Sequence, residues 1–295
     1  MKKEQELKDI VKQRYTTIAE QGKAENASSC CGATIPSNKV YNIMMDDYSE
    51  TSGYVEDADL GLGCGLPTQF AHIQKGDTVI DLGSGAGNDC FVARHETGSE
   101  GKVIGIDFTP IMIQKARSNA EKLGFNNVEF REGDIDAMPV NDAVADVIVS
   151  NCVLNLVPNK EKVISEIHRV LKHGGHFSIS DIVLVGDLPE ALKQDAEMYA
   201  GCVAGAIQKG DYLKLIEDRG FQNIKIQKEK TIRIPDDILS KYLSQDEIQS
   251  FNKGATGIYS ITVYAEKEGV RQEKPKLKLS EIQASDCCEP TSGCC

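Results

Sequence analysis

The sequence predicts an α/β fold in which a mainly parallel sheet carries helices on both faces. Short β-branched runs alternate with helical patterns from Asp77 onwards, and a glycine-rich turn lies between the first run and the first helix. An aspartate, Asp107, closes the second run. Such alternation is typical of parallel sheets, because neighbouring parallel strands need a long crossover that is usually helical. Ligands of such sheets bind at the carboxyl ends of the strands.

Five short runs rich in Val and Ile are expected to be the strands of this sheet. They comprise residues 78–81, 103–107, 128–130, 146–150 and 176–180. Helices are expected between them at 110–124 and at 160–172, where apolar residues recur at helical spacing. The second helix is expected to stop at the pair Gly174-Gly175, because glycine adopts the left-handed conformation that ends many helices.

The regions on both sides of this core have different patterns. Residues 1–20 place apolar side chains on one helical face, whereas 22–66 are broken by Gly, Ser, Asn and Asp, which predicts an irregular extension. Beyond the core, we expect helices at 188–205, 210–219 and 237–251 and strands at 224–226 and 258–264. From residue 268 the chain is rich in Lys, Glu, Gln and Ser, as flexible tails are. The expected units are an N-terminal helix and extension at 1–66, a core at 67–185, a C-terminal α+β region at 186–267 and a tail at 268–295.

The charge of the chain speaks against nucleic acid as a partner. Its 295 residues include 33 basic and 45 acidic side chains, which gives a net charge of −12. Proteins that coat DNA or RNA need clustered Lys and Arg to neutralise phosphates. The first residues lack the apolar run of a signal peptide, and no stretch approaches the length of a membrane span. We therefore expect a cytoplasmic protein without nucleic-acid or membrane partners.

Ten cysteines are the unusual feature of the composition. They lie at Cys30, Cys31, Cys64, Cys90, Cys152, Cys202, Cys287, Cys288, Cys294 and Cys295. In the cytoplasm structural disulfides are uncommon, and cysteines more often bind soft metals or carry out redox chemistry. The thiols are therefore candidate functional groups.

The turn after the first strand, residues 81–87 with the sequence DLGSGAG, is the candidate cofactor loop. Glycine allows the main chain to turn sharply and to approach a ligand more closely than a residue with a Cβ atom. Asp107 follows Gly85 by 22 residues, a spacing at which a carboxylate can accept hydrogen bonds from ribose hydroxyls. Both NAD and S-adenosylmethionine meet this description.

Two details favour S-adenosylmethionine over NAD. The loop has glycines at alternate positions instead of the pattern GxGxxG, and the sequence GDI follows the third strand at 133–135. Both features resemble the Rossmann-like methyltransferases. The resemblance implies that Asp81 and the glycines hold the methionine part of the cofactor, that Asp107 holds the ribose and that Asp134 holds the adenine amine. We assign cofactor binding to Asp81, Gly83, Ser84, Gly85, Gly87, Asp107, Asp134, Ile135 and Asn151.

Cys152 lies within the segment NCVLNLVP at 151–158, directly after the fourth strand. Because ligands bind outside the carboxyl ends of parallel strands, this thiol is expected to face the reacting methyl group. A cysteine at a strand end is also a common small core residue, and its position alone does not separate the two interpretations.

Several segments closely resemble the arsenite methyltransferases. They are GCGL at 63–66, the glycine loop followed by NDC at 88–90, NCVLNLVP at 151–158 and HRVLKHGG at 168–175. Cys202, in GCVAGA at 201–206, follows Cys152 by 50 residues and completes the match. The resemblance extends from Cys64 to Phe221. It implies an enzyme that transfers methyl groups from S-adenosylmethionine to thiol-bound trivalent arsenic, and so produces methylated arsenicals for detoxification.

The resemblance also implies a role for individual cysteines. Trivalent arsenic is expected on Cys64, Cys152 and Cys202, and soft thiolate sulfur is the ligand that such a thiophilic centre prefers. The region 186–267 then becomes an arsenic-binding or lid region. An N-terminal cysteine is expected in a disulfide relay that thioredoxin or glutathione restores. Cys30 and Cys31 both lie where that cysteine belongs, and their adjacency leaves the choice open.

The remaining candidates have simpler interpretations. We expect Cys90 to be a small core residue, and His173 and His176 to cap or pack at the end of a helix. The tail cysteines are compatible with a zinc site, with an arm that captures arsenic, or with no catalytic role. Leu62 departs from the aromatic residue found at its position in many relatives. We expect a monomer.

Two other functions are compatible with the motifs. The chain could methylate an organic small molecule, with its cysteines serving only as core residues. It could also be a protein that binds or senses a metalloid and has lost catalysis.

Overall fold

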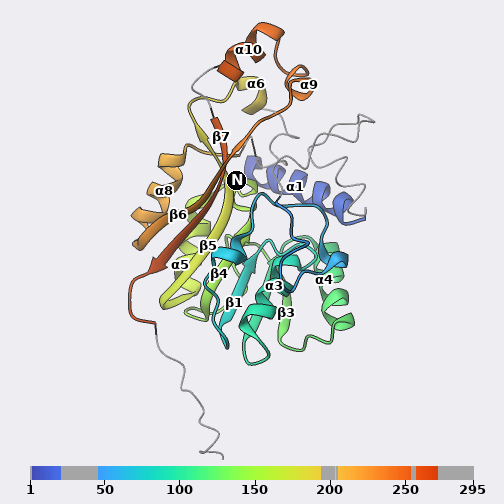
Figure 1. The fold of residues 1–295 in the computed structure, drawn as a ribbon, viewed down its shortest axis with the longest axis vertical. Helices are drawn as coiled ribbons and strands as arrows, with labels where there is room; N and C mark the ends of the chain where they lie inside the picture. The colour runs from blue at the N-terminus through green and yellow to red at the C-terminus, as the bar shows by residue number, and fades with distance from the viewer. Residues whose placement is uncertain (1, 21–45, 194–202, 204, 254–256, 272–295) are drawn as a thin grey trace, which may run out of the picture.

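The computed structural model describes residues 2–20, 46–193, 203, 205–253 and 257–271. A seven-stranded sheet with the order β3-β2-β1-β4-β5-β7-β6 runs through the molecule (Figure 1). Its strands are β1 (Thr78–Leu82), β2 (Lys102–Asp107), β3 (Val128–Glu132), β4 (Ala145–Asn151), β5 (Leu171–Val185), β6 (Phe221–Ile232) and β7 (Gly257–Lys267). The first five are parallel, whereas β7 runs antiparallel to both β5 and β6. The predicted mainly parallel α/β sheet is therefore confirmed.

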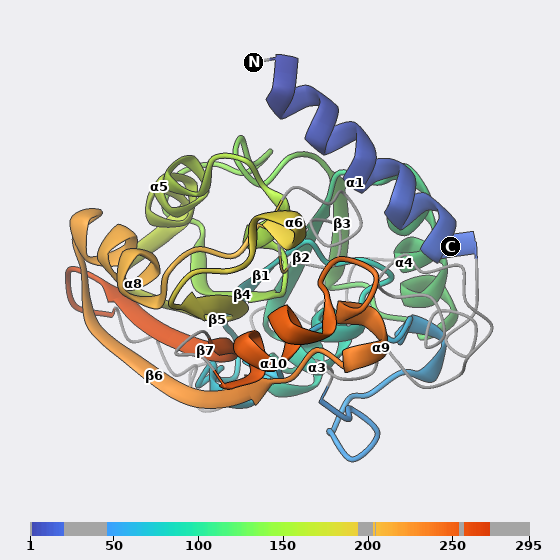
Figure 2. The ribbon, with the colours of Figure 1, turned by 90° about the horizontal axis from the view of Figure 1, so that it is seen from above.

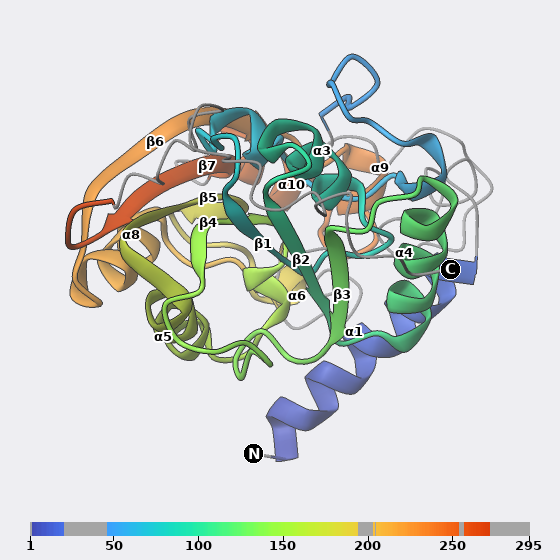
Figure 3. The ribbon, with the colours of Figure 1, turned by 90° about the horizontal axis from the view of Figure 1, so that it is seen from below.

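The central strands are apolar on both sides because helices cover both faces of the sheet. Successive side chains of a strand point to opposite faces. Val79 therefore packs with residues of α3 (Asn88–Thr97) and α4 (Pro110–Lys122), whereas Ile80 packs with residues of α5 (Lys160–Val170) and α8 (Lys209–Asp218). The two helix layers lie on opposite sides when the sheet is viewed from below (Figure 3).

The strand order creates a crevice between β1 and β4. These strands are neighbours in the sheet, although β2 and β3 separate them in the chain. The chain therefore leaves β1 toward one edge of the sheet and continues from β4 toward the other. The loops after the two strands diverge, which leaves room for a ligand at their carboxyl ends.

The expected helix at 160–172 is shorter than predicted, and the glycine pair does not cap it. α5 ends at Val170, and Leu171 already pairs with Ala145 as the first residue of β5. Leu171 is fully buried, so packing in the sheet outweighs another turn of helix. Gly174 lies inside β5 with φ +73°, and a Cβ atom there would collide with the main chain of Arg271.

The C-terminal region joins the same fold. The helix expected at 237–251 is divided into α9 (Asp236–Leu239) and α10 (Gln245–Lys253), and α6 (Glu190–Lys193) lies within the helix expected at 188–205. These three helices gather beyond one end of β5 and β7 (Figure 1). Leu192, Leu239 and Ile248 pack in one apolar cluster with Cys64 and Cys152. The C-terminal helices thus belong to the surroundings of two of the predicted site residues.

The N-terminal helix is present as α1 (Lys2–Glu20) and lies beside α4 (Figure 2). Ile18 and Ala19 are buried against Met112 of α4. The described part of the extension, residues 46–66, contains the short 3₁₀ helix η1 (Glu56–Ala58), and a second one, η2 (Pro67–Phe70), follows it directly. Within the described residues, no helix combines the length and apolar character that crossing a bilayer requires.

Candidate active site

A cleft opens where β1, β2 and β4 end. Most of the residues assigned to the cofactor line it, namely Asp81, Gly83, Ser84, Gly85, Asp107, Asp134, Ile135 and Asn151, and Cys152 lines it as well. Gly87 does not. It precedes α3 with φ +102°, and a Cβ atom there would press against the rings of Phe91 and Phe130, so its lack of a side chain serves helix packing.

The glycine turn places main-chain atoms at the floor of this cleft. Gly83 and Ser84 donate their N–H groups to the carbonyl of Ile106, with N–O distances of 2.8 and 3.0 Å. Gly85 has φ +51°, and no atom lies within 4 Å of the position that its Cβ would take. Because Gly85 lines the cleft, that open space is room for a ligand to approach the main chain.

Two aspartates at the strand ends flank the turn. Asp107 accepts hydrogen bonds from the N–H groups of Gly85 (3.1 Å) and Thr109 (2.8 Å), so β2 holds the turn in place. Asp81 accepts a hydrogen bond from the Cys90 thiol at 3.2 Å. Burial, with the neighbouring charge of Asp89, raises the pKa of Asp81 well above its ordinary value. A cationic ligand group such as an amino group would restore the charged form of this carboxyl.

Cys90 is thus a core residue, as expected, and its thiol also donates a hydrogen bond to Asp81. It is fully buried, and burial together with the Asp81 charge raises its pKa well above the ordinary value of a thiol. A thiol in this state stays protonated and acts as a hydrogen-bond donor. His173 and His176 are expected at the end of a helix but lie within β5, where they contact the main-chain carbonyls of Glu268 and Ala71 respectively. Of these two residues, only His176 is buried.

Buried polar atoms in the cleft fit a polar ligand. Ser84 Oγ and Asn88 Oδ1 are buried and have no hydrogen-bond partner among the described residues. Both residues line the cleft next to the open space at Gly85. Buried polar atoms without partners are costly, and a bound molecule with donors and acceptors removes that cost. The lining residues therefore fit a polar ligand such as S-adenosylmethionine. That Asp81 and the turn hold its amino-acid part and Asp107 its ribose stays a prediction.

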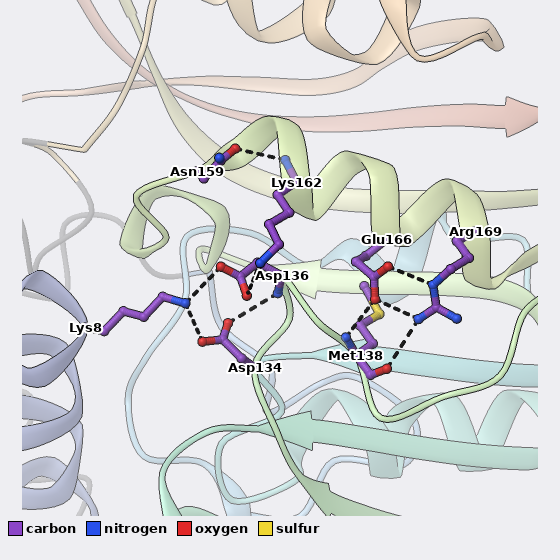
Figure 4. A network of polar contacts seen from close by, with 8 residues as sticks. All are labelled: Lys8, Asp134, Asp136, Met138, Asn159, Lys162, Glu166 and Arg169. Carbon is purple, nitrogen blue, oxygen red and sulfur yellow. Dashed lines mark hydrogen bonds and ion pairs between the residues drawn. The ribbon is translucent and has the colours of Figure 1, made fainter. Parts of the chain in front are cut away.

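The other end of the cleft contacts α1 through Lys8, which sequence reasoning missed. Lys8 Nζ contacts carboxylate oxygens of Asp134 at 2.5 Å and Asp136 at 2.8 Å (Figure 4). Lys162 Nζ approaches Asp136 from α5 at 3.5 Å. Val11 and Tyr15 of α1 also line the cleft. The N-terminal helix therefore closes the end where Asp134 is expected to meet the adenine amine.

Lys8→Met is expected to weaken S-adenosylmethionine binding about three- to tenfold, because a partly buried pair of charge-assisted hydrogen bonds contributes on the order of 1 kcal/mol. The substitution keeps an apolar stem but no longer ties α1 to the loop of Asp134. Isothermal titration calorimetry measures the dissociation constant. Lys122→Met is the matched control, because its ion pair with Asp57 is exposed. Equal affinities for both variants would show that the Lys8 contacts contribute nothing to cofactor binding.

The structure brings two of the three predicted arsenic ligands together. Cys64 and Cys152 are buried and pack in the same apolar cluster. Cys152 has φ +61° and donates its N–H group to the carbonyl of Ser180 at 2.7 Å. Burial and the neighbouring charge of Asp181 raise the pKa of the Tyr212 hydroxyl well above its ordinary value.

The other predicted cysteines lie outside the described residues. These are Cys30, Cys31, Cys202 and the four tail cysteines. Within the part of the chain that the structure describes, no three His, Cys, Asp or Glu side chains cluster as metal ligands. Cys64 and Cys152 thus form the described part of the predicted set, and the role of Cys202 stays a prediction.

Asp181 is a buried carboxyl that directly follows Ser180, the residue whose carbonyl contacts Cys152. It accepts hydrogen bonds from the Ile182 N–H group at 3.0 Å and the Tyr212 hydroxyl at 3.4 Å. Burial raises its pKa from 3.8 to about 7. Between about pH 4 and pH 7 the Asp181 carboxyl is ionised in the unfolded chain but keeps its proton in the folded chain. The free energy of unfolding must therefore fall as pH rises through this range.

Asp181→Asn is expected to remove this pH dependence. From pH 5 to pH 8 the free energy of unfolding of the unchanged protein should fall by about 2–3 kcal/mol relative to the variant, which has no proton to lose. Urea unfolding of both proteins at each pH measures the difference. Parallel pH curves would mean that Asp181 ionises as easily in the folded chain as in the unfolded one.

Comparisons with known proteins show which family the chain belongs to. The family model described as "Methyltransferase domain" matches residues 73–220. An arsenite methyltransferase of Halobacterium salinarum is 41% identical over 235 residues, which cover 75% of this chain and 59% of that protein. One of Aquipseudomonas alcaligenes is 32% identical over 83% of this chain and 70% of its own length. The chain thus spans less than two thirds of the Halobacterium protein.

One solved structure is also similar to this chain. The arsenic(III) S-adenosylmethionine methyltransferase CrArsM of Chlamydomonas reinhardtii aligns with a TM-score of 0.60 and 30% identity, over 77% of this chain and 73% of that chain. The cleft at the ends of β1, β2 and β4, the two buried cysteines beside it and these matches point the same way. The chain is a member of the arsenite methyltransferase family.

Proposed function

We propose that this chain transfers methyl groups from S-adenosylmethionine to trivalent arsenic held by cysteine thiolates. One observation carries the proposal: Cys152 lines the cleft that fits the cofactor and also packs with Cys64 in a buried cluster. The methyl acceptor would therefore lie directly beside the methyl donor. When bound, S-adenosylmethionine supplies a methyl group on a positively charged sulfur.

The donor set suits arsenic. Thiolate sulfur is a soft ligand that binds thiophilic centres in preference to imidazole or carboxylate. Each thiol that binds arsenite would give its proton to a hydroxide of arsenite, which leaves as water. We include Cys202 as a third ligand, supplied by the proposed arsenic-binding region at 186–267. Three sulfur ligands leave arsenic with a lone pair, which can displace the sulfonium sulfur from the methyl carbon.

The proposed reaction needs no general base at the reacting atom, because the arsenic lone pair carries no proton. The chain would act by holding arsenic and the methyl group in line at near-attack distance. The Asp107 contact with Gly85 fixes the cofactor turn, and the Cys152 contact with Ser180 fixes the thiol loop. The end of β2 thus supports the cofactor side of the reaction, and β5 supports the thiol side.

Turnover would also need electrons. Methyl transfer converts arsenic from the trivalent to the pentavalent state, and two cysteine thiols can return two electrons by forming a disulfide. We propose Cys30 or Cys31 for this relay, with thioredoxin or glutathione reducing the disulfide. A monomer in the cytoplasm, where such reductants are abundant, completes the proposal.

The test is an assay with purified protein, S-adenosylmethionine, arsenite and a thiol reductant. Liquid chromatography with arsenic-specific mass detection should show methylated arsenicals together with S-adenosylhomocysteine. Binding of both ligands without either product would leave a metalloid-binding protein. Methyl transfer to an organic acceptor but not to arsenite would identify a different methyltransferase.

A further inference from the structure

The side chain of Asn151 connects the two cysteine loops. Asn151 is the last residue of β4 and directly precedes Cys152. Its Oδ1 atom accepts a hydrogen bond from the main-chain N–H of Cys64 at 2.9 Å, and its Nδ2 atom donates to the carbonyl of Gly65 at 2.8 Å. The orientation of this amide therefore determines how the main chain of Cys64 lies against the Cys152 loop.

Tyr48 and Asp89 determine the orientation of the amide in turn. Asn151 Nδ2 donates to the Tyr48 hydroxyl at 2.6 Å, and that hydroxyl donates to the Asp89 carboxylate at 2.8 and 2.9 Å. Tyr48 and Asp89 are only 3% and 8% exposed, so water does not compete with these bonds. The pKa of Asp89 is raised to about 6 by burial, so near neutral pH the carboxyl is mainly ionised and can accept the bond.

The loop that carries Cys64 is shaped for this contact. Gly63 has φ +110°, and a Cβ atom on it would lie 2.7 Å from Asn151 Nδ2. The carbonyl of Cys64 accepts a hydrogen bond from Ser260 Oγ on β7. The main chain of Cys64 is thus held at its N–H group by Asn151 and at its carbonyl by Ser260. The Tyr48–Asp89 pair supports the Asn151 contact.

Tyr48 and Asp89 also border the cofactor cleft. Asp89 lies in the first turn of α3, two residues after the glycine turn, and both Tyr48 and Asp89 line the cofactor cleft. A continuous path of contacts therefore leads from the start of α3 through Tyr48 and Asn151 to Cys64. Neither Tyr48 nor Asp89 is among the residues assigned from the sequence.

We propose that Tyr48 and Asp89 are positioning residues, which act through Asn151 to hold Cys64 at the distance from Cys152 that trivalent arsenic requires. The inference rests on the proposed function, because it names what sets the geometry of that site. It assigns these two residues no contact with the reacting atoms.

The binding test uses a full-length protein in which six cysteines outside the proposed ligand set and outside the described residues are serine: Cys30, Cys31, Cys287, Cys288, Cys294 and Cys295. The probe is phenylarsine oxide, a trivalent arsenical with two exchangeable positions for thiols. Tyr48→Phe, which loses only a hydroxyl, should raise its dissociation constant about tenfold, the equivalent of one hydrogen bond. Affinity for S-adenosylmethionine should change less than about twofold.

Two controls separate positioning from a general structural effect. Tyr264→Phe also removes a tyrosine–carboxylate hydrogen bond, the one to Glu266, and should leave both affinities unchanged. In a Cys64→Ser background, Tyr48→Phe should have no further effect on the arsenical, because a residue that acts through Cys64 has nothing left to position. Asp89→Asn keeps an oxygen that accepts from Tyr48 and should retain most of the arsenical affinity.

Each contrary result decides against the inference. An unchanged arsenical affinity in Tyr48→Phe, an equal loss with and without Cys64, or a parallel loss of cofactor affinity would overturn it. These outcomes do not depend on methyl transfer, so an inactive wild-type protein would refute the proposed function and still leave the positioning role measurable. In an active protein, Tyr48→Phe should lower kcat about ten- to a hundredfold with little change in KM for S-adenosylmethionine.

Discussion

Cys152→Ser is expected to lower the rate of arsenite methylation by at least about a thousandfold, because the proximity of bound reactants supplies most of the proposed catalysis. Serine has nearly the same shape, so the hydrogen bond from residue 152 to Ser180 should persist. Its hydroxyl is a hard ligand that does not replace thiolate at a soft centre. The dissociation constant of S-adenosylmethionine should stay within about twofold, because the thiol donates nothing essential to the cofactor.

Arsenic-specific mass detection measures the rate, and calorimetry measures cofactor binding. Cys90→Ser is the matched comparison for arsenite binding, since Cys90 is another buried thiol but contacts Asp81. Its variant should bind arsenite normally. If Cys152→Ser methylates arsenite at the normal rate, Cys152 does not belong to the arsenic site.

Gly85→Ala is expected to weaken S-adenosylmethionine binding about a hundredfold, near the upper end of the cost of overfilling a close-fitting contact. The Cβ atom would meet no protein atom within 4 Å, and because Gly85 lines the cleft we expect it to occupy space that the cofactor needs. Alanine at φ +51° adds strain on the order of 1 kcal/mol, which the fold should tolerate.

Gly124→Ala provides a control for that strain. Gly124 follows α4 with φ +67°, and a Cβ atom there also meets nothing within 4 Å. Both variants should therefore lose similar stability in urea unfolding, whereas only Gly85→Ala should lose cofactor affinity. Equal cofactor affinities in the two variants would place the cofactor away from Gly85.

Much of the fold follows from local patterns. Strands such as β1 and β4 are rich in Val and Ile and are buried along almost their whole length, because helices cover both faces of a parallel sheet. The end of α5 was predicted wrongly because a glycine pair is a local signal, whereas the pairing of Leu171 with Ala145 depends on a distant strand. The long β5 and β7 likewise exceed their predicted ranges, because each gains hydrogen bonds from the other.

In the candidate site, too, some residues could be predicted from local patterns and others could not. The cofactor residues could be predicted because they follow strand ends, and parallel strands bring their carboxyl ends to one edge. Lys8, Tyr48 and Asp89 could not, because their partners lie far away: Lys8 meets Asp134, 126 positions along the chain. Lys8 lies on an amphipathic helix and Tyr48 in an irregular segment, and no local sequence pattern indicates which distant residues they contact.

The sequence by itself determined the order of strands and helices, the glycine turn, the acids at the ends of β1 and β2 and after β3, and the cysteine motifs that identify the family. These features are local, since backbone conformation and burial period depend on neighbouring residues. Only the tertiary structure decided that Cys64 and Cys152 share one buried apolar cluster, that α1 lines the cofactor cleft and that Asn151 joins the segments of the two cysteines. Such contacts join segments that are far apart in the chain. They form because folding removes polar groups from water, and each buried polar group then needs a hydrogen-bond partner within the protein.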